Sequence, residues 1–335
     1  FQVAGKVTPE RWAGNRLEEI SPFAEYNQWK EASGGDPEED ILSTLTFVPD
    51  GFEVQCLRIA EEDEDSWVNL ELDSSGRILI AKEQKGILRM TPDKTGRIEK
   101  VETVNEDLEE CRGLLWSSEN SLFANANDSK ALYRLKDTSG DDSFDEVTLL
   151  RSTVGGSGHG RNDLAEDSTG AIHIIHGDSI EVPAEADRHT LSEIGAPLEL
   201  GHWIRTDRSG KSWEILARGL RNPYGIAFNP DGEAFTYDAD NEGDVGLPFY
   251  RPTRINHLVS GANYGWHQER ENTRNMTVYS PDSWPTTYDV GRGSPTAVKF
   301  GTESHFPDIY KEALFALDWA YGRIQAVHLT PRGSS

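Results

Sequence analysis

The sequence predicts an all-β fold, a six-bladed β-propeller of which five blades are visible along the chain. After residue 45, short apolar runs alternate with turn residues, as expected for strands. A weak unit of strand, tight turn and strand also recurs, as LDSSGRILIA, WSSENSLFAN, AEDSTGAIHII and FNPDGEAFTY. Its turn residues Gly76, Asn120, Gly170 and Gly232 lie 44, 50 and 62 residues apart. This period fits blades of about four strands, whereas a sandwich would show only closer turns.

The first 44 residues differ from the rest, because they are polar and lack the strand-and-turn pattern. Helix-friendly residues surround Trp12 and Phe23, and the glycines and proline of residues 33–37 then break the pattern. We interpret residues 1–44 as an N-terminal arm on the main fold and residues 45–335 as the propeller. A charged extension that does not pack on the propeller is the alternative.

The two ends of the propeller raise the question of how its ring closes. A fifth unit of strands occupies residues 306–327, and an early strand expected at Phe52–Leu57 is of the kind that closes a ring from its other end. The ring either has five blades or lacks a sixth, which a missing part of the chain or another chain would supply. Because proteins avoid open sheet edges, we expect a missing sixth blade.

Composition argues against several classes of function. The chain of 335 residues has 33 basic and 58 acidic residues, and its net charge of −25 repels nucleic acids and anionic membranes. No apolar run is long enough to span a membrane, and no Cys-x-x-Cys-His motif is present to attach haem. Since the chain begins at Phe1 without an apolar leader, we expect an exported protein, periplasmic or secreted, whose signal peptide has been removed. Cys56 and Cys111 allow one disulfide, and two buried thiols are the alternative.

The stretch HGRNDLAEDSTGAIHIIHGD holds the main candidates for catalysis. His159 follows a glycine-rich segment and precedes an inner strand, whereas Asp178 comes 19 residues later, after the second strand of the same hairpin. An antiparallel hairpin brings its two ends together, so these side chains can meet at one mouth of the propeller. An aspartate that accepts a proton from one imidazole nitrogen leaves the other nitrogen basic. A histidine that only satisfies a nearby turn is the alternative.

Three later features add candidate binding residues. Arg221 precedes another inner strand in RGLRNPYGIAFNPDG, and its permanent charge suits an anion or an oxyanion, with a salt bridge between blades as the alternative. Four acidic residues then alternate from Asp238 to Asp244, a density that suits either Ca²⁺ or a solvated acidic loop. In NHLVSGANYGWH, Tyr264 and Trp266 suit packing in the channel wall or stacking on a cofactor.

These stretches resemble the soluble quinoprotein glucose dehydrogenases and aldose sugar (sorbosone) dehydrogenases. The segment from His159 to Asp178 resembles their catalytic-histidine stretch, RNPYGIAFNPDG their Arg-Asn-Pro motif, and GANYGWH their Gly-Asn-Tyr-Gly-Trp motif. GLPFYRPTRINHLVSGANYGW, GRGSPTAVKFG and ALFALDWAYGRIQAVHLTP look like the membrane-bound dehydrogenase type of propeller that is common in planctomycetes. Such propellers often belong to larger proteins with a separate cytochrome c segment. The resemblance covers residues 45–335, and the shared order of the motifs supports it.

The resemblance implies a six-bladed propeller that binds pyrroloquinoline quinone (PQQ) and Ca²⁺ in its mouth. His159 would take the hydroxyl proton of a sugar or polyol, Asp178 would orient it, and Arg221 would hold the quinone oxygen that gains charge. Electrons would pass to a separate cytochrome c. The residues implied at the cofactor are Arg221, Asn222, Tyr264 and Trp266, and those implied at the metal are Asp240, Asn241 and Asp244.

The chain departs from the family pattern at two places beside these motifs. Ala239 stands where the family has a glutamine that touches the cofactor, and Thr253-Arg254 stands where it has an acidic pair. Two other functions fit the same fold. One is a non-catalytic propeller for binding or docking in a larger redox or polysaccharide-handling assembly. The other is a lactonase propeller with calcium in its central channel, held by Glu, Asn and Asp side chains.

Overall fold

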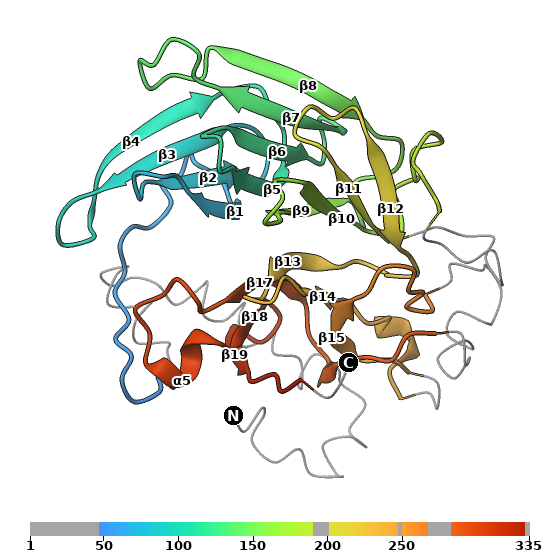
Figure 1. The fold of residues 1–335 in the computed structure, drawn as a ribbon. Coiled ribbons are helices and arrows are strands. Elements are labelled where there is room, and N and C mark those ends of the chain that lie inside the picture. Colours follow the sequence, from blue (N-terminus) through green and yellow to red (C-terminus); the bar gives the residue numbers. More distant parts are fainter. Residues whose placement is uncertain (1–46, 190–200, 247–249, 267–282, 332–335) are drawn as a thin grey trace.

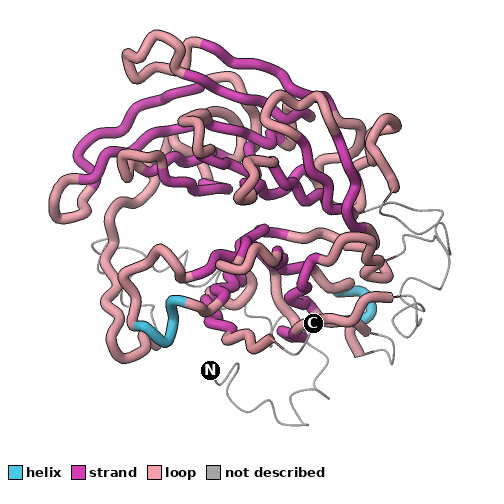
Figure 2. Tube along the Cα trace, viewed as in Figure 1, coloured by secondary structure: helices cyan, strands magenta, loops and turns pink. Residues whose placement is uncertain are grey.

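The computed structural model describes residues 47–189, 201–246, 250–266 and 283–331. Almost all regular structure in these residues is strand, and the strands form five antiparallel sheets (Figures 1 and 2). The helices there are short: η1 (Glu242–Asp244) and α5 (Asp308–Lys311). The prediction of an all-β propeller is therefore confirmed, with five blades in the described residues. The expected arm at residues 1–44 lies outside them.

Each blade is a meander in which strands that follow one another in sequence pair side by side. Blade 1 comprises β1 (Trp67–Leu72), β2 (Ile78–Lys82), β3 (Ile87–Pro92) and β4 (Ile98–Asn105), and blade 2 comprises β5 (Cys111–Trp116), β6 (Leu122–Ala126), β7 (Ala131–Lys136) and β8 (Glu146–Ser152). Blade 3 comprises β9 (Arg161–Glu166), β10 (Ile172–His176), β11 (His202–Thr206) and β12 (Trp213–Ala217). Blade 4 comprises β13 (Tyr224–Phe228), β14 (Ala234–Asp238), β15 (Thr253–Leu258) and β16 (Tyr288–Gly291). Blade 5 has three strands, β17 (Pro295–Phe300), β18 (Leu314–Asp318) and β19 (Arg323–Val327).

The tight turns expected from the repeated unit are present, and the turn between β9 and β10 shows why they form. Gly170 has a φ of 85°, a left-handed conformation that glycine adopts without steric cost, and its N–H donates to the carbonyl of Asp167 at 2.9 Å. The Asp167 carboxylate accepts N–H bonds from Thr169 and Ala171 at 2.8 and 3.0 Å. These turn residues thus fix how β9 and β10 are connected.

Apolar residues between neighbouring blades build the core. The first strands β1, β5, β9, β13 and β17 pack next to one another in that order. Separate buried clusters join blade 1 to 2, 2 to 3, 3 to 4 and 4 to 5, and they include Leu114, Ile174, Leu220 and Tyr237 respectively. Blades 2, 3 and 4 each contribute buried apolar residues to a cluster on both sides, so each of them packs between two neighbours.

The ring is not closed by strands in the described residues. The comparable packing of β17 against β1 is absent there, and the exposed fractions of Leu70 and Leu72 on β1 are 58% and 51%. The segment that leads into β1 runs from beside α5 to blade 1 (Figure 1), and the ring of Phe52 packs edge-on against Phe306 at a centroid distance of 4.8 Å. The expected strand at Phe52–Leu57 is wrong, since this segment pairs with no sheet.

Both cysteines are free thiols, which excludes the bridged alternative in this structure. Cys111 is buried in the core between blades 1 and 2, and burial raises the pKa of its thiol to about 12. Across the described ranges, no helix has the length and apolar character needed to cross a membrane.

Candidate active site

One end of blades 3 and 4 gathers the candidate residues, and strand direction explains why. His159 precedes β9 and Asp178 follows β10, so the hairpin places both at the same end. Arg221 precedes β13 and packs beside them, because the N–H of Asp178 donates to the Arg221 carbonyl at 2.8 Å. We call this end the mouth. The tight turns after β9, β11 and β13 lie at the opposite end.

His159 and Asp178 are in direct contact at the mouth. The Nδ1 atom of His159 lies 2.7 Å from Oδ1 of Asp178. The carboxylate is almost fully buried, with 1% of the side chain exposed, whereas the imidazole keeps 30% exposure. Because a carboxylate only accepts hydrogen bonds, the proton belongs on Nδ1, and Nε2 is left with its lone pair. The arrangement can accept a proton from a bound hydroxyl group.

The backbone around the pair is closely packed, which leaves the histidine little freedom. The N–H of Ser179 donates to the His159 carbonyl at 3.1 Å, and the N–H of Gly177 donates to the Gly160 carbonyl at 2.8 Å. A Cβ atom on Gly177 would lie 2.5 Å from the carbonyl carbon and oxygen of His159. Glycine is therefore required at position 177 for this close approach.

Trp266 is the second partner of the buried carboxylate. Its indole Nε1 donates to Oδ2 of Asp178 at 2.6 Å. The segment that carries it runs parallel to the end of blade 3, with a bridge between Arg218 and Asn263 and an N–H bond from Trp266 to the Gly219 carbonyl at 2.8 Å. Sequence reasoning assigned Trp266 to the cofactor and missed this contact.

Arg221 extends the same network. Its guanidinium lies over the Trp266 ring, 5.4 Å from the centroid, and Nη2 is 3.2 Å from Oε2 of Glu242. Its buried Nε has no hydrogen-bond partner in the described part of the chain. A buried donor without a partner is costly, so this site suits an incoming anionic or carbonyl oxygen.

Asp238, at the end of β14, shapes the loop that presents Arg221. Its fully buried carboxylate accepts the N–H groups of Arg221 and Asn222, the latter at 2.9 Å, and a side-chain bond from Arg254 at 2.8 Å. Sequence reasoning grouped Asp238 with the acidic run that could bind Ca²⁺, but its oxygens face backbone donors and a guanidinium. Arg254 stands where the resembling family has an acid, and it balances this charge.

Asn222 lies beside Arg221 and is already bonded to blade 3. Its Oδ1 accepts from Nδ2 of Asn162 at 3.0 Å, and the same Nδ2 donates to the Pro223 carbonyl at 2.7 Å. Tyr264, by contrast, is fully buried in the core between blades 3 and 4, where its hydroxyl donates to the His257 carbonyl at 2.6 Å. This position favours packing over contact with a ligand.

The expected metal residues Asp240, Asn241 and Asp244 follow β14 in one loop. Asp240 accepts a hydrogen bond from the Tyr250 hydroxyl on Oδ2, and its buried Oδ1 has no partner among the described residues. The Asn241 carbonyl accepts the N–H of Asp244 at 3.0 Å. Burial raises the pKa of Asp240. No cluster of three or more acidic, His or Cys side chains suited to a metal occurs in the described ranges.

Two further titratable groups of blade 3, one partly buried and one fully buried, do not join the network. Asp163 on β9 accepts the N–H of Ile226 at 3.2 Å, and burial raises its pKa to about 6. His176 is paired with His202 at 2.9 Å between Nδ1 and Nε2, and burial lowers the pKa of His176 well below its usual value. This histidine is therefore neutral.

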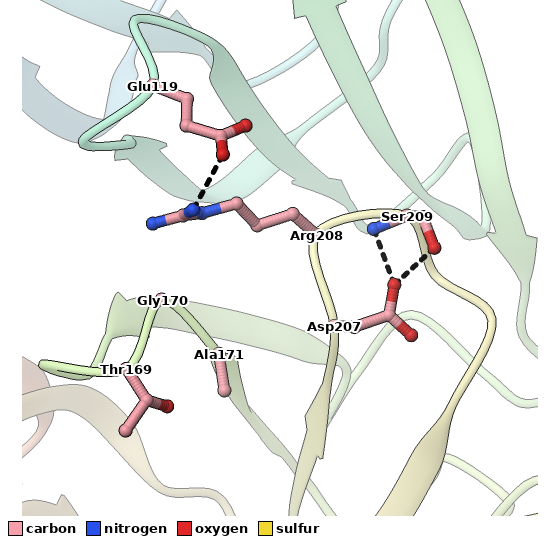
Figure 3. Close-up of a pocket in the computed structure, with 7 residues that line it drawn as sticks. All are labelled: Glu119, Thr169, Gly170, Ala171, Asp207, Arg208 and Ser209. Carbon is pink, nitrogen blue, oxygen red and sulfur yellow. Dashed lines mark hydrogen bonds and ion pairs between the residues drawn. The ribbon is translucent and has the colours of Figure 1, made fainter.

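A surface hollow of about 490 Å³ lies at the end opposite the mouth, between the turns after β5, β9 and β11 (Figure 3). Arg208 is its most prominent charge, but the guanidinium already contacts Glu119 at 2.8 Å and Glu166 at 2.5 Å. Asp207 accepts bonds from its own turn, including the N–H of Ser209 at 2.7 Å. The charged groups of this hollow are satisfied internally, so we assign no function to it.

Comparison with known proteins identifies similar folds. No protein-family model and no curated protein sequence matches the chain. Among solved structures, an oxidoreductase described as a glucose dehydrogenase from Thermus thermophilus is 19% identical with a TM-score of 0.56, over 79% of this chain and 80% of that one. The calcium structure of a carbohydrate-active enzyme of family AA12 from Trichoderma reesei is 15% identical with a TM-score of 0.57, over 85% of each chain.

A third structure is the PQQ-bound aldose sugar dehydrogenase from Streptomyces coelicolor, 15% identical with a TM-score of 0.50, over 78% of this chain and 81% of that one. At such identities the likeness shows the fold alone. The resemblance to sugar-dehydrogenase propellers seen in the sequence is confirmed at that level.

Proposed function

We propose that this propeller is a quinone-dependent dehydrogenase that oxidises a hydroxyl group of a sugar or polyol. The observation that carries the proposal is the contact of 2.7 Å between His159 and Asp178, in which a buried carboxylate orients a partly exposed imidazole. The shared fold with sugar dehydrogenases supports it. The imidazole also keeps 30% exposure, so solvent can reach the pair.

His159 acts as the general base in this proposal. Its Nε2 accepts the proton of the substrate hydroxyl, while Nδ1–H stays bonded to Asp178. The resulting imidazolium is stabilised by the ionised carboxylate beside it. Since that carboxylate is buried, water screens the attraction only weakly. Removal of the proton from the hydroxyl oxygen prepares the departure of a hydride from the carbon that bears this oxygen.

The residues around Arg221 fit a bound PQQ. When bound, PQQ would supply the acceptor for the substrate hydride, which carries the two electrons of the oxidation. Arg221 offers a buried Nε–H without a partner in the described residues, and this donor would hold an oxygen that becomes more negative. Asn222 lies next to it and would complete the contact. Asp238 keeps both residues in place through their backbone N–H groups.

A calcium ion fits the loop after β14 through Asp240. The buried Oδ1 of Asp240 lacks a partner in the described residues, and a hard divalent cation prefers such an oxygen. Backbone carbonyls of Asp240 and Asn241 and the side chain of Asp244 would add ligands. Binding would also keep Asp240 ionised against the effect of its burial.

We propose the location of the protein and its electron acceptor from the same resemblance. The protein is exported, periplasmic or secreted, and a separate cytochrome c accepts the electrons. An acidic surface with a net charge of −25 would favour a basic partner.

Purified chain, PQQ, CaCl₂, a panel of sugars and polyols and a dye acceptor provide the test. We expect dye reduction with at least one sugar, and its loss in His159→Gln. His257→Gln is the matched control, because His257 also pairs with a carboxylate at 2.7 Å, that of Glu233 at the opposite end of the blades. This variant should keep the activity.

Three results would contradict the proposal. Silence with every substrate, in protein shown to bind PQQ, would indicate a propeller that serves binding or docking. Release of acid from a lactone without dye reduction would indicate a calcium-dependent hydrolase. An equal loss of activity in both histidine variants would remove His159 from the role of base.

A further inference from the structure

The buried carboxylate of Asp178 has one donor on each oxygen. Oδ1 faces Nδ1 of His159 at 2.7 Å, and Oδ2 accepts the indole N–H of Trp266 at 2.6 Å. With 1% of its side chain exposed, Asp178 has almost no access to water. An ionised carboxylate in such a place depends on the donors that the fold provides.

We propose that Trp266 is a positioning residue that holds Asp178 in the orientation required to align His159, and that its ring is not a stacking surface for a cofactor. The catalytic part of this proposal rests on the proposed function. Its structural part concerns only the side chains of Trp266, Asp178 and His159. It gives Trp266 a different role from the one that the sequence resemblance implied.

The surroundings of Trp266 favour a positioning role over stacking on a cofactor. The exposed fraction of the residue is 7%, and its backbone N–H is bonded to the Gly219 carbonyl. One face of the ring is covered by the Arg221 guanidinium at 5.4 Å. Little of the ring surface remains for a ligand, whereas the indole N–H donates its hydrogen bond to Asp178. Two hydrogen bonds to opposite oxygens stop the carboxylate from rotating about its Cβ–Cγ bond.

The hydrogen bond also affects the charge that His159 experiences. A donor on Oδ2 draws negative charge from the carboxylate, which weakens its attraction for the imidazolium. Without that donor, and with Asp178 still in place, His159 should hold its proton to higher pH. Removal of the N–H should therefore raise, and not lower, the pH at which His159 loses its proton. A purely structural role for Trp266 would not predict this direction.

The other ionisable groups near the pair are held by partners other than Trp266, except that Arg221 also lies over its ring, a contact that the phenyl ring of Trp266→Phe can keep. They are Arg112, which is ion-paired with Glu110 at 2.5 Å and donates to the Gly158 carbonyl, Arg161 with its bonds to carbonyls, Arg221 with Glu242, and the neutral His176. A shift in the His159 titration thus reports on Asp178 and its remaining donor.

The test is an NMR titration of His159 in the full chain without cofactor or substrate. The resonance is assigned by its loss in His159→Gln. In Trp266→Phe, we expect the titration midpoint of His159 to rise by about one pH unit. Trp203→Phe is the matched control: Trp203 is a comparably buried tryptophan of blade 3, and its N–H bonds to His173 at 3.0 Å, away from the pair. That variant should leave the midpoint unchanged.

A double-mutant cycle completes the design. In the Asp178→Asn background, Trp266→Phe should no longer move the midpoint, because the carboxylate charge is gone. If Trp266→Phe does not fold, replacing Trp266 site-specifically with β-(3-benzothienyl)alanine removes the N–H and keeps the ring shape. An unchanged midpoint in a folded variant, or an equal shift in the Asp178→Asn background, would overturn the proposal.

Activity measurements distinguish this proposal from the proposed function. If the chain is a dehydrogenase, loss of the indole N–H should lower kcat by roughly ten- to a hundredfold with a smaller effect on KM. A shifted titration in a chain that oxidises no sugar would sustain the positioning role and reject the dehydrogenase. Full activity with an unshifted titration would sustain the dehydrogenase and reject the positioning role of Trp266.

Discussion

At the scale of single residues, Asp178 determines what His159 can do. Its carboxylate requires the proton on Nδ1 and leaves Nε2 as the base. In Asp178→Asn the side-chain amide can donate to Nδ1, which places the proton on Nε2, so that Nε2 can no longer accept the proton of the substrate hydroxyl. We expect kcat to fall by about a hundredfold or more, with little change in KM. Steady-state kinetics with the dye assay measure both values.

Asp231→Asn serves as the control for this substitution, since Asp231 is exposed in the turn at the opposite end of blade 4. It should retain the rate of the unmodified chain. A rate in Asp178→Asn within about threefold of that control would show that the carboxylate does not orient the base.

At the scale of elements, the hairpin of β9 and β10 brings the pair together only because its connections are tightly packed. Gly177 lies under His159, and a Cβ there would come within 2.5 Å of the His159 backbone. We expect Gly177→Ala to displace His159, to lower kcat strongly and to destabilise the fold by about 1–3 kcal/mol. Gly156→Ala is its control, because the nearest atom to a Cβ there is 3.7 Å away. Equal unfolding free energies for the two variants would contradict this prediction.

The inner strand β9 also carries Asp163, whose ionised carboxylate destabilises the fold at neutral pH. Burial raises the pKa of Asp163 from 3.8 to about 6, so folding favours the protonated form. Its contribution to stability is full below about pH 4 and is lost as the pH rises through about 6. Asp163→Asn should therefore stabilise the protein at pH 8 by about 1–2 kcal/mol, a part of the full cost because the side chain keeps some solvent access.

Denaturant unfolding at pH 8 and at pH 4.5 measures this effect. The gain from Asp163→Asn should shrink at the lower pH, where the unmodified carboxyl is already largely protonated. The Asn oxygen can still accept the N–H of Ile226, so the hydrogen bond itself is retained. A gain of the same size at both pH values would exclude ionisation as its cause.

The sequence was informative about these elements where the signal is local. The hairpin from His159 to Asp178 could be predicted, because its two ends must meet whatever the rest of the chain does. The contact of Asp178 with Trp266 spans 88 residues and depends on how one loop runs along blade 3, which no local pattern encodes. Asp238 was misread for the same reason: an acidic run shows the charges but not which oxygen faces backbone donors and Arg254.

At the scale of the whole molecule, asparagine side chains link successive blades. Asn69 donates to the Arg112 carbonyl at 2.8 Å, Asn125 to the Asn162 carbonyl at 2.7 Å, and Asn162 to the Pro223 carbonyl at 2.7 Å. These bonds connect blade 1 to 2, 2 to 3 and 3 to 4, and the last one ends at the loop of Arg221. The geometry of the mouth thus depends on the ring as a unit, although the turns and periods in the sequence could predict only the blades.

The net negative charge of the chain destabilises the folded propeller, and added salt should reduce this destabilisation. With a charge of −25 the folded chain repels itself more strongly than the expanded unfolded chain does. Raising NaCl from 0.1 to 1 M shortens the screening distance from about 10 Å to about 3 Å, so we expect Tm at pH 7.5 to rise by several degrees. The same series at pH 4.7, the isoelectric point of the sequence, should show little change. A Tm that falls with NaCl at pH 7.5 would instead mean that ion pairs such as Arg77 with Asp142, whose attraction salt also screens, outweigh the repulsion.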